Sequence, residues 1–149
     1  MKRLIPLAIC AFALAGCQTA LAGQGSVRDM QSLAEWMKKP PDQQEPSYLL
    51  ARCAGLYHGM GAYIGFEKAA NLKDSAVLFS LAAMKARQQR RGGNIDDYQG
   101  EVERDECGSP RTNNARMHQN YETGGQAFGC DPLSLGDFQL CNSIAKGKS

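Results

Sequence analysis

The apolar residues of this chain recur at the three- and four-residue spacings of helices, and stretches rich in proline, glycine and polar residues separate them. No run of alternating apolar and polar residues is long enough to predict a β-strand. The pattern therefore predicts an all-α fold, a small disulfide-linked helical bundle of about four to five helices. We expect one domain over residues 26–149, because 149 residues leave room for a single core.

Two helices are predicted on either side of a proline-containing connector. The first covers residues 26–39, with Ser26 as N-cap, and ends before Pro40. Its apolar stripe comprises Val27, Met30, Leu33, Ala34 and Met37. The central helix covers residues 48–71, the longest apolar-rich segment after the N-terminal region. One of its faces carries Leu49, Cys53, Leu56, Met60 and Tyr63.

The central segment also carries small residues at a regular spacing. Each glycine inside a helix costs about 1 kcal/mol relative to alanine, so some favourable contact must offset that cost. Ala51, Gly55 and Gly59 recur at every fourth residue. This spacing predicts a groove in which the backbone of a second helix approaches closely.

The third helix is predicted to end in a cluster of basic residues. It follows Asn71, with Asp74 or Ser75 as N-cap, and ends at Arg91 before two glycines. Cations in the last turn of a helix are favoured by the helix dipole. The basic run therefore has a structural explanation, although it could also engage anionic headgroups or an acidic partner.

Two more helices are predicted before the C-terminus. The fourth begins at Asn94, and we expect residues 108–114 to interrupt it before residues 115–123 add one or two turns. The last helix covers residues 132–144. The residues expected to cap these helices or face inward are Ile95, Tyr98 and Val102 in the fourth and Asp131, Pro132, Leu133, Leu140 and Ile144 in the last.

The first sixteen residues have the pattern of an export signal. Lys2 and Arg3 precede a largely apolar stretch over residues 4–15. This stretch is too short to cross a bilayer, which takes roughly 20 apolar residues. We therefore predict a cleaved signal peptide over residues 1–16.

A short motif at the end of the apolar stretch identifies the cleavage site. The motif consists of Leu14, Ala15, Gly16 and Cys17. It resembles, in all four positions, the lipobox of bacterial lipoprotein precursors. The resemblance implies cleavage before Cys17, diacylglycerol on its thiol and acylation of the new amino terminus, with palmitate among the acyl chains. It also implies the periplasmic face of the cell envelope, and Gln18 implies the outer membrane. Residues 17–25 would form a lipidated tether.

A second cleavage site competes with the lipobox. Ala20, Leu21 and Ala22 form an A-x-A site, at which ordinary signal peptidase would release a soluble chain beginning at Gly23. We favour the lipobox because it also explains the cysteine at position 17. The alternative is a protein that is free in the periplasm or secreted.

Removal of the signal changes the charge of the protein. Lys2 and Arg3 account for two of the 17 basic residues, so the remaining 15 equal the 15 acidic residues. A domain without net charge has no basic field to attract nucleic acid, which we therefore exclude as a partner.

The domain contains four cysteines, and export to an oxidising compartment predicts that they form two disulfides. They are Cys53, Cys107, Cys130 and Cys141. A helix over 132–144 would separate Cys130 from Cys141 by roughly 15 Å, whereas the Cα atoms of a disulfide lie within about 7 Å. Those two should not pair. Of the arrangements left, we favour Cys53 with Cys141 and Cys107 with Cys130.

The sequence lacks recognisable motifs for catalysis or metal binding. There is no nucleophile motif and no phosphate-binding loop. The histidines are His58 and His118, and Cys53 lies on a different helix face from His58. The acidic run over 101–106 lacks the spacing of a calcium loop, and we interpret it as a solvated helix face. We predict no metal, no cofactor and no catalytic residue.

These observations favour a non-catalytic role. The leading hypothesis is an envelope-anchored lipoprotein that acts as a binding or accessory protein for an envelope partner through a surface of the bundle. The alternative is a soluble periplasmic protein that binds a small ligand among core aromatic residues, or an enzyme that its motifs do not reveal. The candidate residues for a ligand or partner surface are Tyr57, His58, Tyr63, Phe66, Arg87, Arg90 and Arg91.

Overall fold

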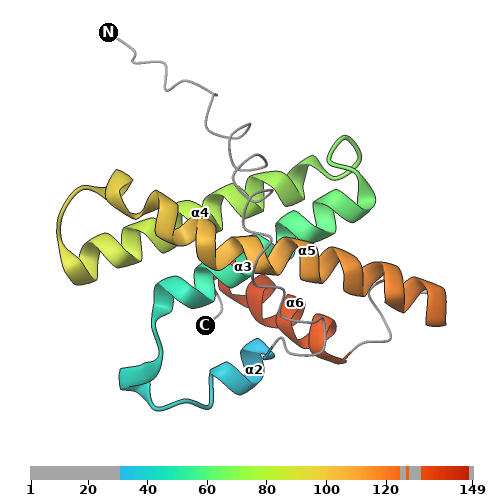
Figure 1. Cartoon of the computed structure of the whole chain (residues 1–149), viewed down its shortest axis with the longest axis horizontal. Coiled ribbons are helices and arrows are strands. Elements are labelled where there is room, and N and C mark those ends of the chain that lie inside the picture. Colours follow the sequence, from blue (N-terminus) through green and yellow to red (C-terminus); the bar gives the residue numbers. More distant parts are fainter. Residues whose placement is uncertain (1–30, 125–126, 128–131, 148–149) are drawn as a thin grey trace, which may run out of the picture.

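The computed structural model describes residues 31–124, 127 and 132–147, and every regular element in these ranges is a helix (Figure 1). The elements are α2 (Leu33–Trp36), the 3-10 helix η2 (Pro41–Gln43), α3 (Pro46–Ile64), α4 (Ala70–Arg91), the 3-10 helix η3 (Ile95–Tyr98), α5 (Gln99–Gly124) and α6 (Pro132–Ala145). Within these ranges α3, α4, α5 and α6 each have 14 or more residues. The predicted all-α bundle is confirmed.

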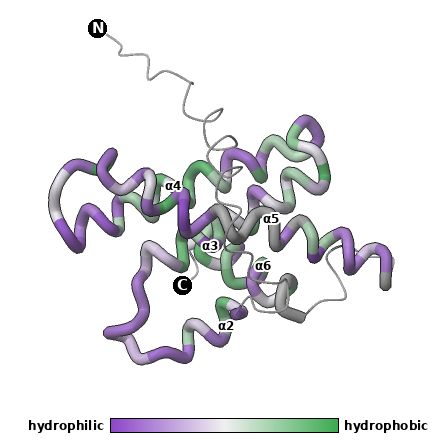
Figure 2. The backbone as a smooth tube through the Cα atoms, viewed as in Figure 1, coloured by the Kyte–Doolittle hydropathy of each residue, from purple (hydrophilic) through white to green (hydrophobic). Residues whose placement is uncertain are grey.

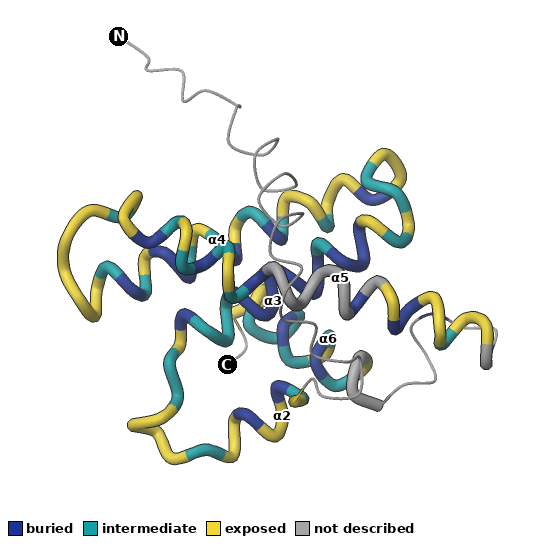
Figure 3. The backbone as a smooth tube through the Cα atoms, in the orientation of Figure 1, coloured by how far each residue is buried: buried dark blue, intermediate teal, exposed yellow. Residues whose placement is uncertain are grey.

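Helix α3 packs between α4 and α5. The chain turns back after α3 to form α4, and η3 returns it to α5 on the other side of α3 (Figure 1). Helix α6 packs against α2 and α3. Apolar and buried positions lie where the helices face one another, whereas the outer faces are mostly polar and exposed (Figures 2 and 3). Among the described helices none is long and apolar enough to cross a membrane.

The core consists of two groups of side chains. The larger group joins α3 to α4, α5 and α6, and the smaller group lies where α3, α4, η3 and the start of α5 meet. The predicted inward residues that these groups contain are Leu33, Leu49, Cys53, Leu56, Met60, Tyr63, Ile95, Tyr98, Val102, Leu140 and Ile144. The period of the sequence therefore predicted the buried faces of α3, η3, early α5 and α6. The side chain of Leu133 lies outside the described part of the chain.

The central helix is shorter than predicted. It ends at Ile64, and Gly65 leaves the helix with φ of 93°, a conformation that glycine adopts without strain. Phe66 then folds back on α3, where a Cβ atom added to Gly61 would overlap its ring. Helix α4 begins at Ala70, ahead of either predicted N-cap. The predicted continuation of the central helix past Gly65 was therefore wrong.

Helix α5 runs without a break through the segment where an interruption was predicted. The prediction of a break over 108–114 was wrong, although this segment contains a glycine and a proline. Helix propensity is a weak preference that tertiary packing overrides. Asn113, Arg116 and Met117 are buried on this helix. Burial of that face against α3 stabilises the continuous helix.

The predicted apolar stripe of the first described helix is only partly buried. Leu33 and Trp36 are buried, whereas Ala34 and Met37 of the predicted stripe are exposed. That part of the stripe was wrong, because a helix of four residues is oriented by what binds its ends. The predicted N-cap Ser26 lies outside the described residues.

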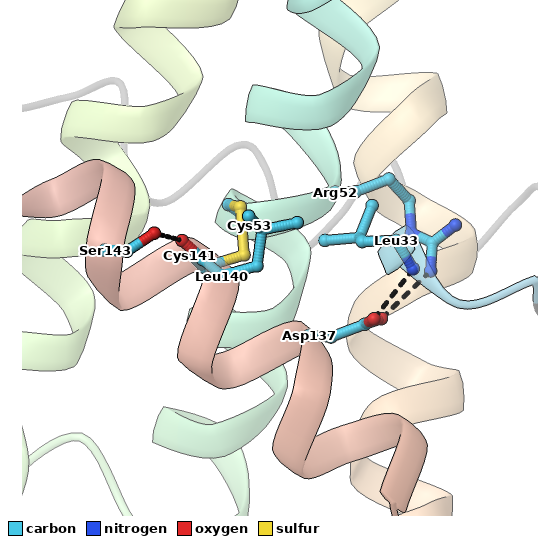
Figure 4. The surroundings of a disulfide bond; sticks show 7 residues. All are labelled: Leu33, Arg52, Cys53, Asp137, Leu140, Cys141 and Ser143. Atoms are coloured by element: carbon cyan, nitrogen blue, oxygen red, sulfur yellow. Dashed lines mark hydrogen bonds and ion pairs between the residues drawn. A yellow bond between two sulfur atoms is a disulfide. The ribbon is translucent and has the colours of Figure 1, made fainter. Parts of the chain in front are cut away.

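Asp137 of α6 holds α2 against the bundle. Its Oδ1 atom accepts a hydrogen bond of 2.7 Å from the backbone N–H of Leu33. Its Oδ2 atom lies 3.7 Å from Nη2 of Arg52 in α3, and both charged side chains are buried. Figure 4 shows these groups beside the disulfide. The free N–H groups at the start of a helix favour such an acceptor, so one carboxylate joins three helices.

A disulfide joins Cys53 of α3 to Cys141 of α6, with 5.5 Å between the two Cα atoms (Figure 4). This bond confirms one of the two favoured pairings, and it confirms that Cys141 does not pair with Cys130. Both bonded cysteines are fully buried. The second predicted bond, Cys107 with Cys130, involves side chains outside the described residues.

We expect the Cys53–Cys141 disulfide to be a main source of stability, because the two cysteines are 88 positions apart in sequence. A disulfide across a loop of this length lowers the entropy of the unfolded chain by an amount equivalent to about 4.5 kcal/mol. Replacing both cysteines by alanine should lower the free energy of unfolding, measured in urea, by about 2–5 kcal/mol.

The control for this experiment is Ser143→Ala in the same helix. Ser143 donates one hydrogen bond of 2.7 Å to the carbonyl of Leu140, and its loss should cost about 1 kcal/mol. Equal destabilisation by the two changes would contradict a dominant contribution from the disulfide.

Candidate functional site

An open cleft of about 560 Å³ lies where the N-terminus of α3, the C-terminus of α4 and the N-terminal part of α5 meet. The segment from α2 through η2 forms its remaining wall. Its charged residues are Lys39, Arg87, Arg91 and Arg104 and Glu45, Glu101 and Asp105, and its aromatic residues are Trp36 and Tyr48. We call this feature the charged cleft.

Arg87 lies at the base of the charged cleft and is only 5% exposed. Its Nη1 donates to Glu101 Oε2 at 3.1 Å, its Nη2 donates to Asp105, and its Nε donates to Ser47 Oγ at 3.1 Å. All three nitrogen atoms of this guanidinium therefore have partners, as a buried cation requires. Arg87 thus joins the end of α4 to the starts of α3 and α5.

Arg91 extends this network to the protein surface. Its Nη1 donates to Glu101 at 2.8 Å, and its Nη2 donates to Glu45 at 3.4 Å. The hydrogen bond that Arg91 donates to Glu101, together with the negative charge of that carboxylate, raises the pKa of Arg91. Glu45 also accepts a hydrogen bond of 2.8 Å from Ser47. The carboxylates of the cleft are therefore already bound to groups of the protein.

The turn between α4 and α5 places these charges opposite one another. Gly92 ends α4 with φ of 78°, and its carbonyl accepts a hydrogen bond of 2.6 Å from the Tyr98 hydroxyl. Asn94 and Asp97 form a capping box at the start of η3. The predicted helix start at Asn94 is therefore confirmed, although its first turn is a 3-10 helix.

Aromatic residues form one wall of the charged cleft. The rings of Trp36 and Tyr48 lie 5.6 Å apart, and Trp36 is buried. Arg52 donates to the Tyr48 hydroxyl at 3.1 Å and lies over its ring. Arg52 also contacts Asp137, which binds the start of α2. We call these contacts of Asp137 with Leu33 and Arg52 the clamp on α2, and this clamp positions the aromatic wall.

Two cations of the charged cleft have no charged or hydrogen-bonding partner for their side chains within the described part of the chain. They are Lys39, which follows α2, and Arg104 in α5. Lys39 is half-buried, and Arg104 is exposed. Their donors are therefore available to a molecule that enters the cleft.

Glu106 lies one residue beyond Asp105 but faces the interior between α4 and α5. It is 6% exposed, and its Oε1 accepts a hydrogen bond of 2.5 Å from Ser80. Burial raises its pKa to about 7, with smaller contributions from the charges of Glu103 and Asp105, while the bond from Ser80 acts in the opposite direction. The interpretation of residues 101–106 as a solvated face was therefore wrong, because two of its carboxylates pair with Arg87 and a third is buried.

The aromatic candidates from the sequence lie farther along α3 or, for Phe66, in the turn after it, and they do not line the charged cleft. Tyr57 is buried against Phe79 and Phe138, with ring centroids 5.5 and 6.1 Å away, and burial raises its pKa. Its contacts are those of a core residue.

His58 and Tyr63 each contact another ring. The edge of one ring meets the face of the other in both His58–Phe66 and Tyr63–His118, at 5.8 and 4.7 Å between centroids. Burial, and secondarily the charge of Lys73, lowers the pKa of His58. The sequence candidates are thus divided: Arg87 and Arg91 line the cleft, whereas the aromatic group and exposed Arg90 do not.

Sequence reasoning missed most of the cleft, but a signal for it was present. Arg87 and Arg91 are spaced by four residues near the end of one helix, and Glu101 and Asp105 have the same spacing near the start of the next. Such spacing places each pair on one helix face. Complementary pairs on either side of a tight turn predict contact between the two helices. No comparable signal indicated Trp36, which the clamp on α2 brings to the cleft.

Among the described residues no group of three or more histidine, cysteine, aspartate or glutamate side chains could hold a metal ion. Comparison of the chain with family models, with curated proteins and with solved structures finds no match in any of the three. What the charged cleft can bind is therefore inferred from its own residues alone.

We predict that Arg87→Gln is strongly destabilising. It removes a buried cation, takes from Asp105 its guanidinium partner and leaves Glu101 with Arg91 alone, so the free energy of unfolding should fall by about 2–3 kcal/mol. Urea unfolding followed by circular dichroism measures this loss. The matched change Arg91→Gln, at an exposed position of the same network, should cost less than about 1 kcal/mol. If the two variants lose a comparable free energy of unfolding, the buried Arg87 contributes no more to stability than the exposed Arg91.

We predict that Glu106 makes stability depend on pH. Its pKa is about 7 in the fold, against an ordinary value of 4.5. The folded protein therefore holds the proton more tightly than the unfolded chain, and stability is lost as the pH rises from about 4.5 through 7. Glu106→Gln should raise the free energy of unfolding at pH 8 by about 3 kcal/mol and leave it nearly unchanged at pH 4.5.

Denaturation in urea at the two pH values tests this expectation, with Glu122→Gln as the control. Glu122 is exposed on the same helix, so its replacement should have little effect at either pH. A Glu106→Gln variant with the same pH dependence as the unmodified protein would contradict the prediction.

Proposed function

We propose that this protein is an exported, lipid-anchored binding protein that holds its ligand or envelope partner in the charged cleft without transforming it. The observation that carries the binding role is the cleft itself, whose ion-paired wall is fixed by the hydrogen bonds of Arg87 and Arg91 before anything enters. A wall that is already ordered adds no entropic cost of its own when a ligand binds beside it.

The chemistry of the cleft supports binding over catalysis. Arginine keeps its proton throughout the physiological pH range and cannot act as an acid or base. The carboxylates of Glu101 and Asp105 already accept hydrogen bonds from arginine. His58 is a side chain of the type that exchanges protons near neutral pH, but it does not line the cleft.

Two observations support export and anchoring. The sequence Leu14 to Cys17 resembles a lipobox, and multiple acyl chains on one terminus suffice for stable attachment to a membrane. The buried disulfide between Cys53 and Cys141 is typical of an oxidising compartment. A tether that begins at Cys17 would lead into α2, the helix that borders the charged cleft.

Intact-mass measurement of the protein purified from detergent-extracted envelopes tests the anchor. We expect a mature chain that begins at Cys17 and carries the mass of a diacylglycerol and one further acyl chain. A chain that begins at unmodified Gly23 would overturn the anchored form and leave the soluble periplasmic alternative.

A pair of substitutions sharpens this test. Cys17→Ser should move the protein from the membrane fraction to the soluble fraction, with cleavage after Ala22. Cys10→Ser removes a cysteine from the same signal outside the lipobox and should leave the protein in the membrane fraction. Release of both variants to the same extent would count against lipid attachment at Cys17.

A further inference from the structure

We infer that the charged cleft binds a small anionic molecule, carrying a carboxylate or a phosphate group, through Lys39 and Arg104. This inference rests on the proposed function, which makes the cleft a binding site, and it adds the chemical class of the ligand.

The charge of the cleft favours an anion. Its lining contains four cationic and three anionic side chains. Arg87 and Arg91 are bound to Glu45, Glu101 and Asp105. These two arginines and three carboxylates together carry one net negative charge, so the net positive charge of the lining comes from Lys39 and Arg104, the two cations whose side chains have no partner among the described residues.

A cationic ligand would meet a competing interaction at the same site. Glu101 accepts both of its hydrogen bonds at Oε2, 3.1 Å from Arg87 and 2.8 Å from Arg91. A cation at its other oxygen would lie close to these two guanidinium groups, which repel it. An anion meets no such repulsion from Lys39 and Arg104, whose ammonium and guanidinium donors are available to it.

The size and lining of the cleft favour a small polar molecule. Its volume of about 560 Å³ lies within the range of pockets that hold small ligands. Lys39 and Arg104 come from segments far apart in the sequence, one after α2 and the other in α5. A ligand bound to both would therefore hold the α2 segment against α5.

A single tryptophan makes binding in the cleft directly measurable. The chain contains one tryptophan, Trp36, and it lines the cleft. We would titrate the full processed chain, in a non-ionic detergent, with citrate, with inorganic phosphate and with the cationic probe putrescine, and record tryptophan fluorescence. We expect saturable changes with citrate or phosphate at a Kd below about 1 mM, weakened at higher ionic strength.

Two double variants separate the cleft from general electrostatics. Lys39→Gln with Arg104→Gln should weaken anion binding at least tenfold. Lys85→Gln with Arg90→Gln removes the same two charge types from exposed positions of α4 outside the cleft, and it should change the Kd by less than twofold. Circular dichroism verifies that each variant is folded. In the first double variant, Lys39→Arg in place of Lys39→Gln should restore anion binding.

Each other outcome overturns the inference. Equal weakening in both double variants would mean that diffuse charge attracts the anions, and no saturable change with either anion up to 10 mM would mean that the cleft does not bind them. A response to vesicles of phosphatidylglycerol but to neither free anion would assign the site to a membrane surface. If putrescine binds and Glu101→Gln abolishes its binding, the anionic class of ligand is overturned but the cleft remains a binding site. Failure of lipid attachment would not affect this titration, so the two proposals can fail separately.

Discussion

The burial of the Arg87 guanidinium is the constraint on which the arrangement of the helices around the cleft depends. This group cannot lose its charge, so a buried position requires acceptors around it. Ser47, Glu101 and Asp105 supply them from α3 and α5. Satisfying one cation therefore fixes three helix ends relative to one another. The charged cleft is the space that these ends enclose, and its carboxylates are ordered by the same bonds.

A second buried charge sets the other wall. Asp137 near the C-terminus binds the start of α2 and lies against Arg52 in α3, and the neighbouring Cys53–Cys141 disulfide joins α6 to α3. Trp36 reaches the cleft because this clamp orients a helix too short to orient itself. The two walls are thus held by different ion pairs. Changes in α6 are expected to alter the shape of a site to which α6 contributes no lining residue.

The sequence predicted which helices form better than it predicted where they begin and end. Spacing of apolar residues identified the buried face of α3, and helix length excluded pairing of Cys130 with Cys141. Local signals failed where tertiary contacts outweighed them. Burial of Met117 and its neighbours carries α5 through a glycine and a proline. The apolar pattern of the sequence continues past Gly65 without a break, but α3 ends there and Phe66 folds back onto Gly61.

By itself the sequence determined the helical class, the buried faces of α3, early α5 and α6, and the exclusion of a Cys130–Cys141 bond, because periodicity and spacing along a helix are local properties. It also contains the residues Leu14 to Cys17, whose resemblance to a lipobox supports the proposed anchor. Only the tertiary structure decided the site, since burial of Arg87 and exposure of Arg90 depend on which face of α4 meets α5. The charges of the cleft come from four segments of the chain. Whether each charge is paired or available is a property of their packing, and no single segment encodes it.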